Sequence, residues 1–254
     1  MKNIWTIAKT TFRLEMRSKL LYGILVFALL YIFFELFLAD LVLKELPMVK
    51  SFGLTGIYFF NAIIALFLGT TSFFKDVERK VVYFVLAKPV SRAQFLLGKF
   101  AGLCLVLLLT TAILGAGYLG LVAYEHGGFD GLGLLAIIMQ YLEMALFIAF
   151  ALFVSTFSSS LLSIVYTSAV FFLGHVVSQL LMDARNIGVT GIKYVLVEIL
   201  YYVFPNLEKF DARDLAIHGV ATPALSLVLA FAYALAYGTL LLAAAVWIFN
   251  KKEI

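Results

Sequence analysis

The sequence predicts an all-α membrane protein with six transmembrane helices. Of its 254 residues, 64% are hydrophobic and 13% are charged, and the mean hydropathy is +1.05. Soluble globular proteins are about half apolar and about a quarter charged. The chain therefore carries too little polar surface to fold as a soluble enzyme or a secreted domain, and too much apolar sequence to be a disordered tail.

Six apolar runs are each long enough to cross a bilayer, which requires about 20 residues. They cover residues 20–39, 52–74, 100–124, 132–154, 161–181 and 224–249. A transmembrane β-barrel would instead show alternating segments of about ten residues. The first run is too long for the apolar core of a signal peptide, and no A-x-A-like site follows it. We therefore predict a single transmembrane domain over residues 1–254.

The basic residues predict the orientation of the chain. Residues 1–19, 75–99 and 250–254 hold most of the 19 Lys and Arg residues, and the positive-inside rule then places both termini in the cytoplasm. Contact with anionic lipid headgroups explains this basic face without a nucleic-acid partner. The single cysteine, Cys104, rules out an intramolecular disulfide.

Residues 3–17 are predicted to form a short helix on the inner leaflet. At 100° per residue, Lys9, Arg13 and Arg17 fall on one face, and Trp5 would lie at headgroup level. The alternative is an ordinary basic flank before the first span.

The longest predicted cytoplasmic loop covers residues 75–99. It places an apolar stretch, residues 81–87, between charged flanks, and Pro89 ends whatever helix precedes it. Ser91 and Gln94 have the spacing of a capping box, which predicts that the third span begins there. Gly98 and Gly102, four residues apart, would let another helix approach closely.

Residues 182–222 form the predicted outer segment between spans five and six. Apolar residues recur with a helical period from Ile192 to Val203, which predicts an amphipathic outer helix that ends before Pro205. Asp211 can cap a second short helix that ends at Gly219.

In this arrangement the chain resembles the type-2 ABC-transporter permease family, with its type V exporter fold. The likeness rests on six spans, Glu78-Arg79, the sequence LAKPVSRAQFLLGK over residues 86–99, and Pro205-Asn206 in the outer segment. Family members usually carry Gly-Thr where this chain has Lys80-Val81. The opening residues look closest to permeases of multi-copper-enzyme maturation systems.

The resemblance implies a function and partners. In the family, the loop between spans two and three forms a coupling helix that docks into a cytoplasmic ABC ATPase. The residues it marks here for that coupling are Glu78, Arg79, Lys88, Pro89, Ser91 and Arg92. It further implies an exporter subunit in a bacterial or archaeal inner membrane, paired with a second permease chain as a homodimer or heterodimer.

The chain itself is not expected to be an enzyme. It lacks a G-x-x-x-x-G-K-[ST] phosphate loop, so ATP and Mg²⁺ would be bound by the partner ATPase and no cofactor by this chain. It also lacks H-E-x-x-H and G-x-S-x-G, which argues against an intramembrane enzyme. A second hypothesis is mechanotransmission, in which ATPase motion acts on an extracytoplasmic protein and no substrate crosses.

Polar side chains inside the spans are candidates for a substrate path or for a structural network. They are Asn61, Gln140, Glu143, His175 and Gln179. Glu143 lies near the middle of its span, where an unpaired carboxylate costs at least ~2.5 kcal/mol. Glu35 lies near the outer interface and is expected to reach water. The Met, Cys and His residues show no spacing that identifies a metal site.

Overall fold

The computed structural model describes residues 2–41, 45–78, 90–126, 128–188, 191–219 and 224–251, and over these residues its regular secondary structure is all helix, with no strand. Six helices are long and apolar enough to cross a membrane. They are α2 (Lys19–Leu41), α3 (Leu46–Glu78), α5 (Arg92–His126), α6 (Gly131–Ser155), α7 (Ser160–Asn186) and α10 (Ala224–Lys251). The six predicted apolar runs therefore correspond to six helices of the length and composition that a membrane span requires.

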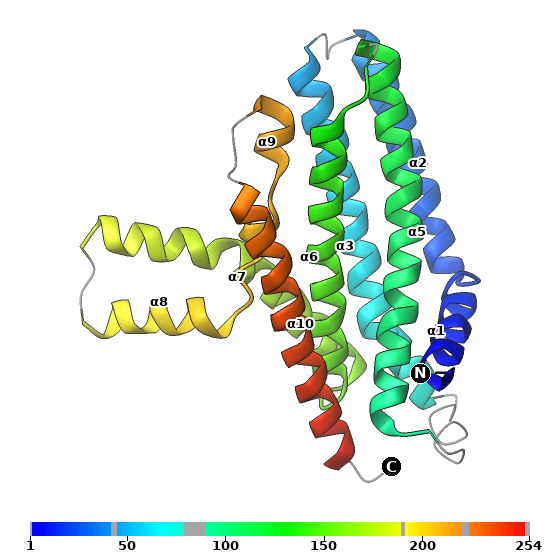
Figure 1. The fold of residues 1–254 in the computed structure, drawn as a ribbon, viewed down its shortest axis with the longest axis vertical. Helices are drawn as coiled ribbons and strands as arrows, with labels where there is room; N and C mark the ends of the chain where they lie inside the picture. Colours follow the sequence, from blue (N-terminus) through cyan, green and yellow to red (C-terminus); the bar gives the residue numbers. More distant parts are fainter. Residues whose placement is uncertain are drawn as a thin grey trace.

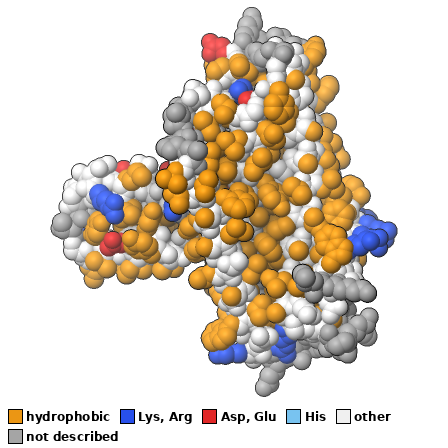
Figure 2. Space-filling view, viewed as in Figure 1, with side chains coloured by type: hydrophobic (Ala, Val, Ile, Leu, Met, Phe, Trp, Pro, Cys, Tyr) orange, Lys and Arg blue, Asp and Glu red, His pale blue; other side chains and the backbone are white. Residues whose placement is uncertain are grey.

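Most of the long helices run side by side in one elongated bundle, with both termini at the same end (Figure 1). Apolar side chains cover much of the bundle surface in the view of Figure 2, and charged side chains are sparse there. Large apolar residues such as Phe33, Leu161 and Phe172 are more than two-thirds exposed. A surface of this kind is stable in lipid and not in water.

Two of the long helices extend beyond the apolar runs that predicted them. Helix α3 has 33 residues and α5 has 35, which corresponds to about 50 Å each against a hydrocarbon core of about 30 Å. The end of α3 and the start of α5 flank the loop that the sequence marked for coupling. Of that loop, Arg79, Lys88 and Pro89 lie outside the described residues.

The short helix α1 (Lys2–Glu15) packs against the first turns of α5. A Cβ atom on Gly98 would lie 2.7 Å from the Ile7 Cβ, and one on Gly102 would lie 2.7 Å from the Ala8 carbonyl oxygen. Both distances are far below van der Waals contact. The prediction that these two glycines admit a neighbouring helix is confirmed, and that helix is α1.

We expect Gly102→Ala to weaken the α1–α5 contact and destabilise the protein by about 1–3 kcal/mol, because the backbone of α1 would have to move. Gly120→Ala is the matched control on the same helix, since nothing lies within 4 Å of its Cβ position. Thermal unfolding midpoints in one detergent compare the two variants. Equal midpoints would contradict the close packing of α1 on α5.

After α7, the chain turns back in α8 (Ile192–Val203), and the last part of α7 forms with α8 a hairpin that projects sideways from the bundle (Figure 1). Helix α8 ends before Pro205, as predicted. The 3-10 turn η1 (Glu208–Phe210) and helix α9 (Arg213–His218) follow, and Gly219 ends α9 in the left-handed conformation. The Asp211 carboxylate accepts a hydrogen bond from the Arg213 amide at the start of α9.

At the end of the bundle opposite the termini, a buried network joins three helices. Lys50 of α3 lies 2.9 Å from the carboxylate of Asp130, which also accepts hydrogen bonds from the Tyr118 hydroxyl and the Gly133 amide. Burial alone would raise the pKa of Asp130, but these hydrogen bonds outweigh it and hold the pKa below its usual value. The ionised carboxylate thus fixes the start of α6.

The expectation that Glu35 reaches water is wrong. Glu35 is 2% exposed, and its Oε1 atom has no hydrogen-bond partner among the described residues. The carboxyl lies next to Gly53 of α3, where the missing side chain leaves room for it beside the Tyr118 ring. Depth along a helix therefore did not decide exposure; the direction of the side chain did.

Candidate functional site

Three polar side chains meet inside the bundle, one each from α3, α6 and α7. The Tyr58 hydroxyl donates a hydrogen bond of 2.8 Å to Oε1 of Glu143, and Nε2 of His175 lies 2.9 Å from the same oxygen. Tyr58 also contacts Nε2 of His175 directly. We call these three residues the central cluster.

The geometry of His175 indicates how the cluster holds its protons. Nδ1 lies 2.8 Å from the Phe171 carbonyl oxygen, which can only accept, so Nδ1 carries a proton. Nε2 faces the Glu143 carboxyl, so one further proton is shared between imidazole and carboxyl. The pair is neutral overall in either arrangement of that proton. This neutrality makes the burial of Glu143 tolerable.

The cluster is buried on one side and partly open on the other. The Glu143 side chain is 2% exposed and the His175 side chain is 26% exposed. The Phe171 ring lies 4.7 Å from the His175 ring and also lines a groove of about 250 Å³ between α3, α6 and α7. His175 is therefore more exposed than Glu143, and the Phe171 ring lies between it and this groove.

Asp211 and Arg213, at the start of α9, bring a charge pair to the cluster. Gly174 lacks a side chain and lets the chain around Pro205 approach α7, where the Leu207 amide donates to the Gly174 carbonyl oxygen. Further along, the Arg213 guanidinium lies 4.9 Å from the centre of the Tyr58 ring. Two hydrogen bonds, of 2.9 and 2.6 Å, join it to the Asp211 carboxylate.

The charge states of this pair follow from those hydrogen bonds. Burial would raise the pKa of Asp211, but the hydrogen bonds from Arg213 outweigh it and the pKa is lowered. The hydrogen bond to Asp211 raises the pKa of Arg213. Both groups are therefore charged at neutral pH, beside the central cluster.

Sequence reasoning named five polar residues in the spans, and the structure brings two of them, Glu143 and His175, into contact. Gln140 donates instead to the Leu54 carbonyl oxygen at 3.2 Å, and Gln179 donates to Asp183 at 3.2 Å. Asn61 is fully buried, and its side chain has no hydrogen-bond partner among the described residues. Where the structure describes the chain, no three His, Cys, Asp or Glu side chains gather as a metal site requires.

Two members of the site had no sequence signal as functional residues. Tyr58 is one of 13 tyrosines in an aromatic-rich chain, and nothing in its neighbourhood marks it as a partner of Glu143. Arg213 follows Asp211 by two residues, a spacing that suggests a local turn. Only the packing of α9 against α3 places Arg213 over Tyr58.

A second group of polar residues lies at the end of the bundle that holds the termini. The Lys99 ammonium of α5 forms an ion pair with the Asp76 carboxylate of α3 and is 2% exposed. Beside it, Lys75 lies 3.4 Å from the carboxylate of Glu15 on α1. We call these four residues the loop-side cluster, because Asp76 and Lys99 lie on the two helices that flank the predicted coupling loop.

Two sets of hydrogen bonds hold the start of α5 in place. The Gln94 amide donates to the Ser91 hydroxyl oxygen, and the Ser91 amide donates to the Gln94 side chain, so the predicted capping box is confirmed. The Arg92 guanidinium donates to the backbone carbonyl oxygens of Phe249 and Asn250 near the end of α10. Arg92 therefore ties the loop to the last helix, and Glu78 ends α3 on the other side of the loop.

The fold and these contacts fit the resemblance that the sequence suggested, and the comparison with family models decides it. Residues 5–254 match the model described as ABC-2 family transporter protein. The chain belongs to this family. Among curated proteins, none matches the chain.

Membership of the ABC-2 family makes the chain a multi-pass membrane permease subunit of an ABC transporter. Permeases of this family are typically not enzymes, and they imply an ATPase partner. The match covers nearly the whole permease and is to the family as a whole. The closer likeness to permeases of copper-enzyme maturation is not supported by it.

Proposed function

We propose that this permease is the membrane-spanning subunit of an exporter driven by a separate cytoplasmic ATPase. The ATPase would bind ATP and Mg²⁺ and dock on the loop between α3 and α5, with Arg79 and Lys88 among its contacts. Two permease chains would enclose the transport path. Family membership over residues 5–254 is the observation that carries this proposal.

The contacts around the loop support the proposal that motion of the ATPase is passed to the helices through this loop. The Asp76–Lys99 ion pair joins the end of α3 to the start of α5, and the Lys75–Glu15 pair adds α1. Arg92 adds the end of α10. A displacement of the loop would therefore move four helices together instead of bending one loop.

The central cluster is proposed to lie on the transport path. Its three side chains come from α3, α6 and α7, so any rocking of these helices against one another changes its hydrogen bonds. Polar groups in a membrane span are costly and are commonly functional. The His175 side chain, which is 26% exposed, is the point at which a substrate would reach the cluster.

Co-purification tests the ATPase partnership. The tagged permease, solubilised from its native host, should bring with it a subunit that carries the Walker phosphate loop. Arg79→Glu should weaken that association by about 30-fold or more, because reversing a charge at a docked interface leaves its partner charge buried and unpaired. Arg92 is unsuitable for this test, since it also holds the end of α10.

Lys193→Glu provides the matched control. Lys193 lies exposed on α8, in the hairpin that projects from the bundle, so its reversal changes the net charge equally without touching the loop. The control should retain the ATPase. A stable permease that purifies without any ATPase, or an Arg79→Glu variant that binds as the control does, would overturn the proposal.

A further inference from the structure

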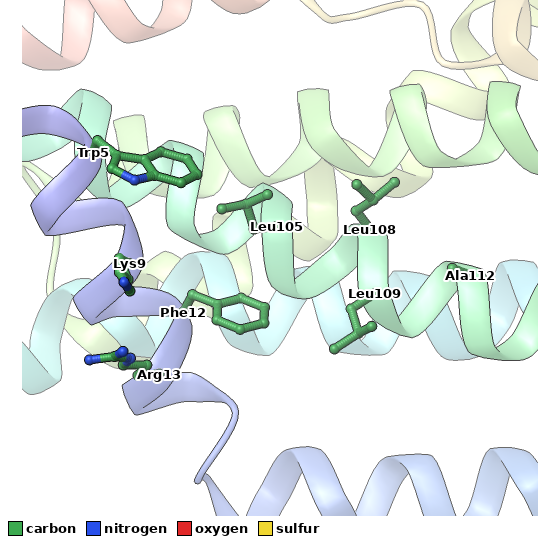
Figure 3. A pocket seen from close by; sticks show the side chains of 8 residues that line it. All are labelled: Trp5, Lys9, Phe12, Arg13, Leu105, Leu108, Leu109 and Ala112. Carbon is green, nitrogen blue, oxygen red and sulfur yellow. The ribbon is translucent and has the colours of Figure 1, made fainter. Parts of the chain in front are cut away.

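Helices α1 and α5 border a recess on the bundle surface. It has a volume of about 580 Å³, and its lining includes Trp5, Lys9 and Arg13 of α1 and Leu105, Leu108 and Ala112 of α5. Figure 3 shows the α5 side chains in a row along the helix, with Lys9 and Arg13 at one end of that row. The recess therefore has a basic end and an apolar wall.

A second recess continues the first along α5. It has a volume of about 510 Å³, lies between α5 and α6, and shares Leu108 and Ala112 with the first. Its lining reaches Leu119, so the two recesses together follow α5 from Leu105 to Leu119, about 21 Å at 1.5 Å per residue. One leaflet of the hydrocarbon core is about 15 Å thick. The joined groove is therefore long enough for an acyl chain.

The charges at the mouth are of one sign. Lys9 and Arg13 are exposed, lie one helical turn apart, and form no ion pair among the described residues. Among the described residues, the lining of both recesses contains no acidic side chain. Trp5 is 62% exposed beside them, as amphipathic rings at the headgroup level of a membrane are. The mouth thus favours a headgroup with a net negative charge over a zwitterionic or cationic one.

We propose that this groove binds one anionic phospholipid of the surrounding bilayer, with its headgroup on Lys9 and Arg13 and an acyl chain along α5. A peptide segment fits the groove poorly, because its backbone needs hydrogen-bond partners and the apolar wall offers few, such as Thr111 and Tyr141. An acyl chain has no such need. The site does not depend on the transport function, only on the membrane location.

Tryptophan quenching tests the proposal on the full chain. The protein has two tryptophans, so the Trp247→Phe variant keeps Trp5 as its only one. This variant is placed in phosphatidylcholine vesicles that contain either phosphatidylglycerol or phosphatidylcholine with brominated acyl chains. Brominated phosphatidylglycerol should quench Trp5 at much lower mole fractions than brominated phosphatidylcholine.

Charge variants then locate the headgroup site. Each basic side chain near an anionic surface contributes about fivefold to binding, so Lys9→Gln with Arg13→Gln should weaken phosphatidylglycerol binding by about 25-fold. Arg17→Gln with Lys19→Gln is the matched control: it removes the same charge from the same end of the bundle, outside the groove lining. An equal effect of both pairs would show general attraction to the membrane and overturn the site.

Filling the groove tests the acyl chain separately. Ala112→Phe would place a ring where the two recesses join and should weaken the same binding by about tenfold or more, as expected when several buried methylenes are excluded. Ile113→Phe is the control, on the next residue and outside both linings. Equal quenching by the two brominated lipids, or an Ala112→Phe variant that binds as Ile113→Phe does, would overturn the proposal.

Discussion

Replacing Lys99 by methionine should destabilise the protein by about 3–5 kcal/mol, because it leaves the Asp76 carboxylate without its partner at a largely buried position. The loop-side cluster holds two acidic and two basic side chains, so the loss of Lys99 also leaves it with a net negative charge. The midpoint of thermal unfolding in detergent measures the effect. Lys193→Met, on an exposed lysine, is the control and should change the midpoint little.

The double variant Asp76→Asn with Lys99→Met separates stability from coupling. A buried ion pair can often be replaced by neutral side chains at little cost, so the double variant should recover most of the lost stability. If the pair transmits force from the ATPase, as we propose, the double variant should fold and still lose ATP-driven transport. Full transport by the stable double variant would limit the pair to a structural role.

The six spans were predictable from sequence because hydropathy reports a property of single segments. About 20 consecutive apolar residues are needed to cross a bilayer, and each run in this chain meets that length without reference to the others. The capping box at Ser91 and the close approach at Gly102 were predictable for the same reason. The signal for each lies within one or two turns of one helix, although the helix that approaches Gly102, α1, could not be read from it.

The pairing of side chains across helices was not predictable in this way. Gln140 lies one turn from Glu143 on the same helix, yet it donates to the Leu54 carbonyl oxygen of α3 while Glu143 contacts His175 of α7. Spacing along a helix gives the depth and the face of a residue. The rotation of the neighbouring helices, which the whole bundle sets, decides the partner.

Glu35 is a second case in which the neighbouring helix, and not the sequence around the residue, decides the environment of the side chain. Its position near the end of an apolar run predicted contact with water, but a glycine on the facing helix leaves room for the carboxyl inside the bundle. Lys99 is a third case, since no sequence pattern predicted its ion pair with Asp76. The residues that sequence reasoning placed wrongly or missed are those whose partner lies on another helix.

Replacing Glu143 by alanine should destabilise the protein by about 3–5 kcal/mol. The change removes the acceptor of the Tyr58 hydroxyl and the partner of His175, and it leaves a cavity in the bundle. Glu143→Gln should cost much less, because a side chain of the same shape fills the site and its amide oxygen can still accept from Tyr58, although it supplies no proton to Nε2 of His175. The thermal unfolding midpoints of the two variants give the comparison.

The same glutamine variant tests the proposed role in transport. Glu143→Gln removes the shared proton from the central cluster while preserving its shape, so a cluster on the transport path should lose transport or substrate-stimulated ATPase activity. Glu35→Gln makes the same chemical change at a buried carboxyl that has no hydrogen-bond partner at Oε1 among the described residues. It should leave activity unchanged.

Three outcomes distinguish the roles of the central cluster. Loss of activity in Glu143→Gln alone, with normal assembly, supports a place on the transport path. Equal loss in Glu143→Gln and Glu35→Gln would indicate that any buried carboxyl is needed for packing or assembly. Full activity in Glu143→Gln would make the cluster structural, since interhelical hydrogen bonds between neutral groups then suffice to hold α3, α6 and α7 together.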